Sequence, residues 1–399
     1  MSATPLVREA PPAAAARASY GLRGRVLFFV NDAQFFVSHR LPLARAARTE
    51  GMEVHVATPA GAAVARIVEE GFVHHEVPLH RWSENPVRDV PTVKRIYAIV
   101  RQVRPRIVHN VTIKPLLYGT LVARAFPDIG IVNAIPGLGT VFVRRGVSAA
   151  ARRRLVLRLY RLLFRDSRVR VILQNREDFR ILRAAGVIED RQASLIRGSG
   201  VDLQEYRFTP LPQGMPIVML AARMLWEKGV REFVDAARAL LARGVSARFV
   251  LVGDSEPGNP SAVPRAQLEA WASERIVEWW GRRADMPSVL AQASLVCLPS
   301  TYGEGVPKVL LEAAACGRPL IATDTAGCRE AVRHGINGLL VAPADDRGLA
   351  GAIREILGER RRAEAMGRRS RQIAELEFGV QVVVDKTLGV YRDLLGWIR

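Results

Sequence analysis

STYGEGVPKVLLEAAACG, residues 300–317, places a glycine-containing turn between a buried apolar run, Leu295–Leu298, and a segment with helical spacing. Strand, turn and helix in this order form the repeating unit of a parallel sheet. Glu304 lies in the turn, and a helix that begins near Gly305 would carry Glu312 about two turns in, at ~3.6 residues per turn. The start of a helix favours a bound anion. The two carboxylates would then accept hydrogen bonds from hydroxyl groups of the ligand on either side of that anion. Alternatively, Glu304 caps a helix and Glu312 is solvated.

The same alternation of apolar runs and helical segments extends through the second half of the chain. The expected strands there are Ile217–Ala221, Arg248–Val252, Ile276–Trp280, Leu295–Leu298 and Leu320–Thr323. Each is followed by a turn and most by a helix, which predicts a parallel sheet covered on both faces.

The first half repeats this pattern. The expected strands are Arg25–Val30, Val54–Thr58, Arg106–His109 and Val169–Leu173, and the expected helices are His39–Gly51 and Pro91–Val103. The fold class is therefore α/β, with two Rossmann-like, doubly wound domains in tandem.

The pattern stops at residues 198–214, GSGVDLQEYRFTPLPQG, a segment typical of an interdomain linker. We predict a disordered tail at 1–20, a first domain at 21–205 and a second at 206–379. The segment 380–399 has helical spacing and would return to the first domain.

Composition is that of a globular protein, with 49% hydrophobic and 24% charged residues. No stretch approaches the roughly 18 to 20 apolar residues that a membrane-spanning helix needs. The N-terminus lacks the pattern of a secretory signal, so we expect the protein to be in the cytoplasm. The three cysteines match no metal spacing, and we expect them to be buried and reduced.

The net charge of +19 is concentrated, because residues 144–183 hold 13 basic and 3 acidic residues. Within this segment, Ser148–Arg165 is predicted to be a helix with Arg154, Arg158, Arg161 and Arg165 on one face and leucines beside them. A basic amphipathic helix is typical of a membrane-surface element, although a core helix with a solvated arginine face has the same pattern.

A second informative stretch is AARMLWEKG, residues 221–229, directly after the first strand of the second domain. It places Arg223 and Lys228 in the loop at the carboxyl end of that strand, where open parallel sheets bind ligands. Two cations in this position suit a diphosphate, whereas a solvated loop is the alternative.

With these two stretches, the chain resembles the retaining family-4 glycosyltransferases of the GT-B fold, in which two Rossmann-like domains face a central cleft. Glu304 and Glu312 match that family's two glutamates separated by seven residues. Arg223 and Lys228 match its R-x-x-x-x-K-G loop, and Gly253 in LVGD matches its glycine after the next strand.

The resemblance extends from Arg25 over most of the chain, and GSGVD at 198–202 matches the family's interdomain segment. One departure lies in the first loop. Many members have a Gly-Gly pair where this chain has Asn31-Asp32-Ala33, so the resemblance does not assign that loop to the donor phosphate.

The resemblance implies a role for each matching residue. Arg223 and Lys228 would neutralise the diphosphate of a nucleotide sugar, Glu312 would hold the ribose hydroxyls and Glu304 would contact the donor sugar. The backbone at Gly253, Gly305 and Val306 would complete the donor site. No protein nucleophile and no metal would be needed, because fixed cations stabilise the leaving diphosphate.

In the first half, NDAQFFVSHRLP at 31–42 and VHNVTIKP at 108–115 resemble the branch that builds surface polysaccharides and lipid-linked oligosaccharides. The implied donor is a UDP-linked N-acetylhexosamine, and the implied acceptor is a glycan on undecaprenyl diphosphate. His109, at the end of its expected strand, and His39 are the candidates facing that acceptor, and a structural role is the alternative for a histidine at a strand end. Ser38 would be a helix N-cap with His39 in the first turn.

The resemblance places the enzyme in the cytoplasm, on the inner face of the membrane, with no separate cofactor. Two other functions stay open. The charge is compatible with nucleic-acid binding, but the chain has no motif for it, and we expect no nucleic-acid partner. A GT-B sugar-nucleotide epimerase fits the fold, but the two spaced glutamates argue against it.

Overall fold

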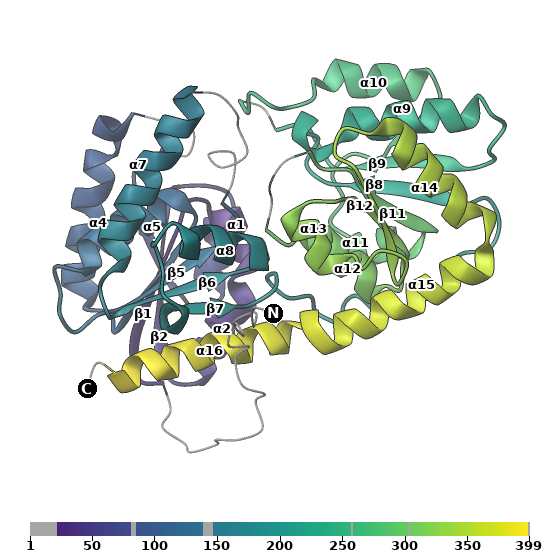
Figure 1. Ribbon diagram of the computed structural model, residues 1–399. Helices are drawn as coiled ribbons and strands as arrows, with labels where there is room; N and C mark the ends of the chain where they lie inside the picture. Colours follow the sequence, from purple (N-terminus) through teal and green to yellow (C-terminus); the bar gives the residue numbers. More distant parts are fainter. Residues whose placement is uncertain are drawn as a thin grey trace, which may run out of the picture. The chain divides into compact units, whose positions relative to one another are not determined.

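The computed structural model describes residues 22–80, 85–138, 147–256, 258–301, 303 and 305–397, which form two compact units. The first unit consists of the chain up to Ser199 together with the segment from Gln381, and the second is Gly200–Val380. Each unit contains one parallel sheet with helices packed around it (Figure 1). The predicted fold class is therefore confirmed.

The first unit has a seven-stranded sheet in the order β3-β2-β1-β4-β5-β6-β7. Its strands are β1 (Gly24–Val30), β2 (Met52–Thr58), β3 (Val73–Glu76), β4 (Ile107–Val111), β5 (Gly130–Ile135), β6 (Val169–Leu173) and β7 (Ala193–Leu195). Its helices are α1 (Ala33–His39), α2 (Leu41–Thr49), α3 (Val64–Glu69), α4 (Val90–Val103), α5 (Ile113–Ala123), α7 (Val147–Phe164), α8 (Arg176–Ala184) and, from Gln381 onward, α16 (Val380–Trp397).

The second unit has a six-stranded sheet in the order β10-β9-β8-β11-β12-β13. Its strands are β8 (Ile217–Ala221), β9 (Arg248–Val252), β10 (Glu278–Trp279), β11 (Leu295–Leu298), β12 (Leu320–Thr323) and β13 (Gly338–Val341). Its helices are α9 (Val230–Leu241), α10 (Arg265–Ser273), α11 (Met286–Ala291), α12 (Lys308–Ala315), α13 (Ala326–Ala331), α14 (Asp346–Gly358) and α15 (Arg360–Ile373).

The apolar strands of the second unit are buried on both faces. On β8, Val218 and Leu220 pack in one hydrophobic cluster with α9 and α14. Ile217 and Met219 point the other way, into a cluster with α11 and α12. Successive side chains of a strand face opposite sides, so a strand covered on both sides is continuously apolar.

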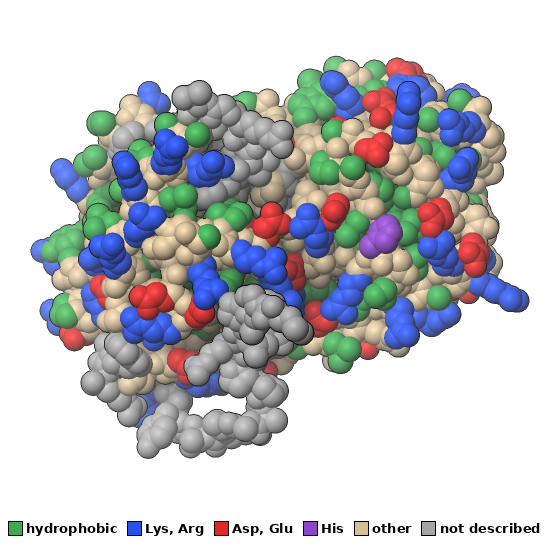
Figure 2. Space-filling view, in the orientation of Figure 1, with side chains coloured by type: hydrophobic (Ala, Val, Ile, Leu, Met, Phe, Trp, Pro, Cys, Tyr) green, Lys and Arg blue, Asp and Glu red, His purple; other side chains and the backbone are tan. Residues whose placement is uncertain are grey.

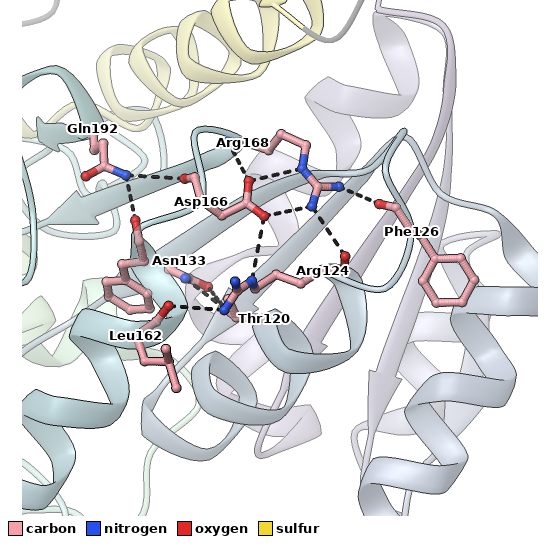
Figure 3. A network of polar contacts seen from close by, with 9 residues as sticks. Thr120, Arg124, Phe126, Asn133, Leu162, Asp166, Arg168 and Gln192 are labelled. Atoms are coloured by element: carbon pink, nitrogen blue, oxygen red, sulfur yellow. Dashed lines mark hydrogen bonds and ion pairs between the residues drawn. The ribbon is translucent and has the colours of Figure 1, made fainter.

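A charged network joins the helices of the first unit to its sheet (Figure 3). Asp166, between α7 and β6, accepts hydrogen bonds from Nε and Nη2 of Arg168 at 3.0 and 2.7 Å and lies 3.7 Å from Nε of Arg124. Arg124 in turn donates to the carbonyl of Leu162 on α7. Burial raises the pKa of Asp166, but the bonds from Arg168 outweigh it, and the net pKa lies below the ordinary value.

The helix predicted at His39–Gly51 is wrong in its start, since two helices, α1 and α2, meet at Arg40. Pro42 supplies the reason: it has no N–H to bond the carbonyl of Ser38, and its ring obstructs that carbonyl. Ser38 is therefore not an N-cap. It lies near the end of α1, where its hydroxyl donates to the carbonyl of Gln34 at 2.8 Å.

The strand expected to end at His109 also differs, because β4 continues to Val111. The polar residue Asn110 is tolerated inside the sheet because its amide donates to the side chain of Asn133 on β5 at 2.9 Å. Gly119 on α5 makes room for this pair, since a Cβ there would lie 1.9 Å from Oδ1 of Asn110.

Two further expectations concern the cysteines and the membrane. Cys297, Cys316 and Cys328 are buried and not in disulfides, as predicted. In the part of the chain that the structure describes, every helix is too short or too polar to span a bilayer.

Candidate functional site

Three loops come together at the carboxyl edge of the second sheet. The strand order reverses between β8 and β11, and crevices outside such a switch point are where open parallel sheets bind ligands. The N–H of Ala222, after β8, donates to the carbonyl of Val252 on β9 at 3.0 Å. The N–H of Thr301, after β11, donates to the carbonyl of Glu227 at 2.9 Å. The loops after β8, β9 and β11 are therefore joined through their backbones.

Two glycines allow this close approach. A Cβ on Gly253 would lie 1.8 Å from the carbonyl oxygen of Ala222, and one on Gly229 would lie 2.1 Å from that of Pro299. Both glycines have positive φ, 135° and 76°, which other residues rarely adopt. The loop that carries Arg223 and Lys228 is thus packed between its two neighbours at positions where only glycine fits.

Arg223 and Lys228 lie in this loop, as the sequence indicated. Arg223 is 48% exposed in its side chain, and its Nη1 lies 2.6 Å from Oε2 of Glu256 in the loop after β9. Lys228 is partly buried in the short 3₁₀ helix Trp226–Lys228, directly before Gly229. Because the Glu256 carboxylate pairs with the Arg223 guanidinium, there is room at this position for an anionic oxygen.

Glu312 lies on α12, but nearer its start than predicted. The helix begins at Lys308 and not near Gly305, because Pro307 has extended backbone angles and forms the N-cap. Glu312 is 7% exposed, so the alternative of a solvated glutamate is wrong. Its Oε1 accepts from the hydroxyl of Tyr206 at 3.1 Å and from Nζ of Lys308 at 3.0 Å.

This arrangement holds Glu312 as a hydrogen-bond acceptor at the carboxyl edge of the sheet. Burial, and then the neighbouring Glu312 carboxylate, raise the pKa of Tyr206, which keeps its hydroxyl protonated as a donor. Among the described residues, Oε2 of Glu312 accepts from no side chain. It can therefore accept from hydroxyl groups of a ligand.

The turn before α12 is described in part. Glu304 lies outside the described residues. Gly305 is partly buried and Val306 buried, and both precede the helix start. The structure thus gathers Arg223, Lys228 and Gly253 in adjoining loops. It records no contact between Glu312 and either cation among the described residues.

His109 lies in the first unit, on the face of β4 that α16 covers. It is 1% exposed, and its Nδ1 lies 2.6 Å from the hydroxyl of Tyr391 on α16. Its Nε2 is buried without a hydrogen-bond partner among the residues that the structure describes. Burial, together with the positive charge of Arg40, lowers the pKa of His109 well below the ordinary value, so the imidazole is neutral.

His39 ends α1, stacks on Phe35 at 4.1 Å between ring centroids, and shares a small pocket with His109. Several residues of these sites were not identified from the sequence. Tyr391 is 282 positions from His109 along the chain, and no local pattern could have paired them. Tyr206 and Glu256 lacked a signal for the same reason: their partners are distant in sequence.

Two family models match the chain. Residues 215–359 match the model for glycosyl transferases group 1. Residues 25–175 match the model for glycosyl transferase 4-like domains. The two matches fall in the second and the first unit respectively.

Among curated proteins, the chain is 26% identical over 379 residues to a transferase of Campylobacter jejuni, N,N'-diacetylbacillosaminyl-diphospho-undecaprenol alpha-1,3-N-acetylgalactosaminyltransferase. That similarity covers 91% of this chain and 97% of the relative. A putative colanic acid biosynthesis glycosyltransferase, WcaL of Salmonella typhimurium, is 32% identical over 39% of this chain and 40% of its own length.

Solved structures with the same fold include HepE of Anabaena in complex with UDP. It aligns with a TM-score of 0.74 at 20% identity, covering 92% of this chain and 100% of HepE. Sucrose-phosphate synthase of Thermosynechococcus elongatus aligns with a TM-score of 0.76 at 20% identity, covering 94% of this chain and 100% of that protein.

The close approach at Gly253 gives a testable expectation. In Gly253→Ala the new Cβ meets the Ala222 carbonyl, so the free energy of unfolding of the second unit should fall by about 3 kcal/mol or more. Gly351→Ala is the matched control: it lies in α14 with nothing near its Cβ, and should be more stable by about 1 kcal/mol.

Tryptophan fluorescence during urea unfolding measures both variants, because Trp226, Trp271, Trp279 and Trp280 all lie in the second unit. Equal stability of Gly253→Ala and the parent protein would contradict the packing of these loops.

Proposed function

We infer the reaction from one premise: the chain belongs to the group 1, family-4 glycosyltransferases, and it is an enzyme of the GT-B fold that transfers a sugar. The sugar donor, the acceptor and the residues that bind them are our proposal. The observation that carries it is the cationic loop Arg223–Lys228, packed between the loops of two neighbouring strands at the switch point of the second sheet.

The donor in this proposal is a nucleotide sugar, and specifically a UDP-linked one. Arg223 and Lys228 bind the diphosphate, which displaces the Glu256 carboxylate from the guanidinium. The backbone at Gly253, Gly305 and Val306 completes the phosphate site, and Oε2 of Glu312 accepts from the ribose hydroxyls. UDP and UDP-glucose complexes of HepE, a protein with the same fold, support this class of donor.

The reaction needs charge stabilisation more than it needs a nucleophile. As the bond from the sugar to the diphosphate breaks, negative charge grows on the leaving oxygen, and fixed cations nearby stabilise it. Arg223 and Lys228 supply these charges, so the proposed reaction proceeds without a metal ion. Glu304, which the sequence resemblance assigns to the donor sugar, orients the ring. The configuration at the transferred carbon is retained.

The acceptor in this proposal is a lipid-linked glycan of surface-polysaccharide biosynthesis, and the transferred sugar is an N-acetylhexosamine. The Campylobacter relative, aligned over nearly its whole length, is named for transfer of N-acetylgalactosamine to a sugar on diphospho-undecaprenol. The colanic acid relative supports the same biosynthetic class. In this proposal His109 of the first unit contacts the acceptor.

A lipid-linked acceptor requires the enzyme to work at a membrane surface, and we assign this contact to α7. Leu155, Leu159 and Leu162 are exposed on this helix, and Arg154 and Arg158 are exposed beside them. Basic and hydrophobic side chains accordingly lie together over this part of the first unit (Figure 2). The leucines would enter the headgroup region while the arginines attract anionic lipids, placing the enzyme on the inner face of the cytoplasmic membrane.

The site assignment predicts the effect of two substitutions on transfer. Lys228→Ala removes a charge from the leaving diphosphate and Glu304→Gln removes a carboxylate from the sugar site, so each should lower the transfer rate by about 100-fold or more. Product formation from a UDP-N-acetylhexosamine and undecaprenyl-diphosphate acceptor measures this. Lys94→Ala, at an exposed position on α4, is the control. Undiminished rates in both site variants would reject the assignment.

The membrane contact predicts binding to vesicles that depends on lipid charge. The protein should sediment with phosphatidylglycerol vesicles but not with phosphatidylcholine vesicles, and added salt should weaken binding because each arginine contributes about 1 kcal/mol of screened attraction. The variant Arg154→Glu with Arg158→Glu should stay in the supernatant. Arg161 is left unchanged, because its Nε donates to the carbonyl of Ala185 at 3.1 Å.

The matched control for vesicle binding reverses Arg361 and Arg368 on α15 of the second unit. It changes the net charge by the same amount, so a general charge effect would release both variants. Release of both, or of neither, would reject α7 as the membrane contact.

A further inference from the structure

A small pocket lies between the first sheet and α16, toward the carboxyl ends of β5 and β6. It is lined by residues of the first unit, among them His39, Arg40, His109, Gln174, Ser199 and Thr387. The pocket is partly open and has a cavity volume of about 20 Å³. That volume holds roughly one water-sized group, so it suits a single oxygen of a larger ligand whose remainder lies outside.

Arg40 carries a buried positive charge in this pocket. It is 7% exposed, and its one hydrogen bond among the described residues runs from Nη1 to the carbonyl of His39 at 3.2 Å. The described residues that line the pocket include no aspartate or glutamate. Nε of Arg40 is buried without a partner in the part of the chain that the structure describes, and burial lowers the pKa of the side chain to about 10.

A second buried arginine, with a pKa also lowered to about 10 by burial, differs from Arg40 in the number of its carbonyl partners. Arg318, in the second unit, is fully buried, has no carboxylate partner among the described residues, and has an Nε that is also unpartnered there, but its guanidinium donates to the carbonyls of Pro210, Ala293 and Thr209. These oxygens compensate its charge. Arg40 has one such bond, and a buried cation with so little compensation is costly unless a ligand supplies the missing acceptors.

His109 lines the same pocket and carries a second hydrogen-bonding group without a partner among the described residues. Tyr391 is fully buried, and Nδ1 of His109 is the partner of its hydroxyl within the described chain. The hydroxyl must donate its proton to Nδ1 to be satisfied, so the neutral imidazole carries its own proton on Nε2. This Nε2 is the atom that is buried and has no partner in the described part of the chain.

Both unpartnered groups are therefore N–H donors, one of them charged. We propose that this pocket binds one anionic oxygen of a phosphate, and that the phosphate belongs to the diphosphate of the lipid-linked acceptor. The acceptor assignment rests on the proposed function. The donor diphosphate has its own cations, Arg223 and Lys228, in the second unit, whereas the pocket lining belongs wholly to the first.

A purely structural role for Arg40 makes a different prediction about stability. If its function is to bind the carbonyl at the end of α1, Arg40→Gln lowers the melting temperature of the free protein. If the buried charge serves to bind a ligand, Arg40→Gln leaves the melting temperature of the free protein unchanged or raises it. Arg40→Lys, which keeps the charge but loses the guanidinium fork, provides a second variant with a conservative change.

The direct test is titration calorimetry with inorganic phosphate and pyrophosphate on the full chain, with UDP present at saturation to occupy the second unit. The parent protein and Arg101→Gln, an exposed control on α4, should bind both anions. Arg40→Gln should bind at least about tenfold more weakly, and Arg40→Lys should fall between them. Equal affinities of Arg40→Gln and the parent would overturn the proposal, whether or not the enzyme transfers a sugar.

Kinetics then assign the source of the phosphate. With undecaprenyl-diphosphate acceptor, Arg40→Gln should raise the KM for acceptor at least about tenfold and leave the KM for donor unchanged. With the same glycan lacking its diphosphate, the parent and the variant should perform equally. A raised KM for donor, or an equal effect on the acceptor without diphosphate, would overturn the acceptor assignment.

Discussion

The contact on which the second unit depends is between backbones. At Gly253 and Gly229 the loops after β8, β9 and β11 approach so closely that no side chain fits, which fixes where the Arg223–Lys228 loop can lie. The strands are mostly apolar because both faces of the sheet are covered, so the charged groups at this edge come from the loops and from the start of α12. An anion site formed by these loops is preorganised, and little ordering remains to be done when a ligand binds.

The two units treat their cations differently. In the second, Arg223 is half exposed and paired with Glu256, so its charge is compensated until a stronger anion displaces the carboxylate. In the first, Arg40 is buried with one carbonyl as its partner among the described residues, next to the neutral imidazole of His109. At Arg223 the diphosphate of the nucleotide sugar would replace the Glu256 carboxylate. This reversible exchange suits a substrate that binds and leaves in every catalytic cycle. In the first unit, two buried N–H groups lack hydrogen-bond partners among the described residues. Such groups favour a sugar acceptor that carries an anion over one that does not.

Most strands could be predicted from sequence, because a strand buried on both faces is an unbroken apolar run, as in β8 and β11. The Arg223 and Lys228 loop could be placed from its position after β8. The helix starts could not: Pro42 divides α1 from α2, and Pro307 delays α12, so that Glu312 is nearer the helix start than its spacing from Gly305 indicated. The His109–Tyr391 pair depends on packing between residues 282 positions apart, which no local pattern contains.

The central claim is that fixed protein cations at this edge of the second sheet bind the donor diphosphate, and titration calorimetry with UDP in buffer containing EDTA tests it most directly. The parent protein should bind UDP in EDTA, added Mg²⁺ should not change the affinity, and Lys228→Ala should bind at least about tenfold more weakly. UDP binding that disappears in EDTA and returns with Mg²⁺, or that Lys228→Ala leaves unchanged, would contradict the account.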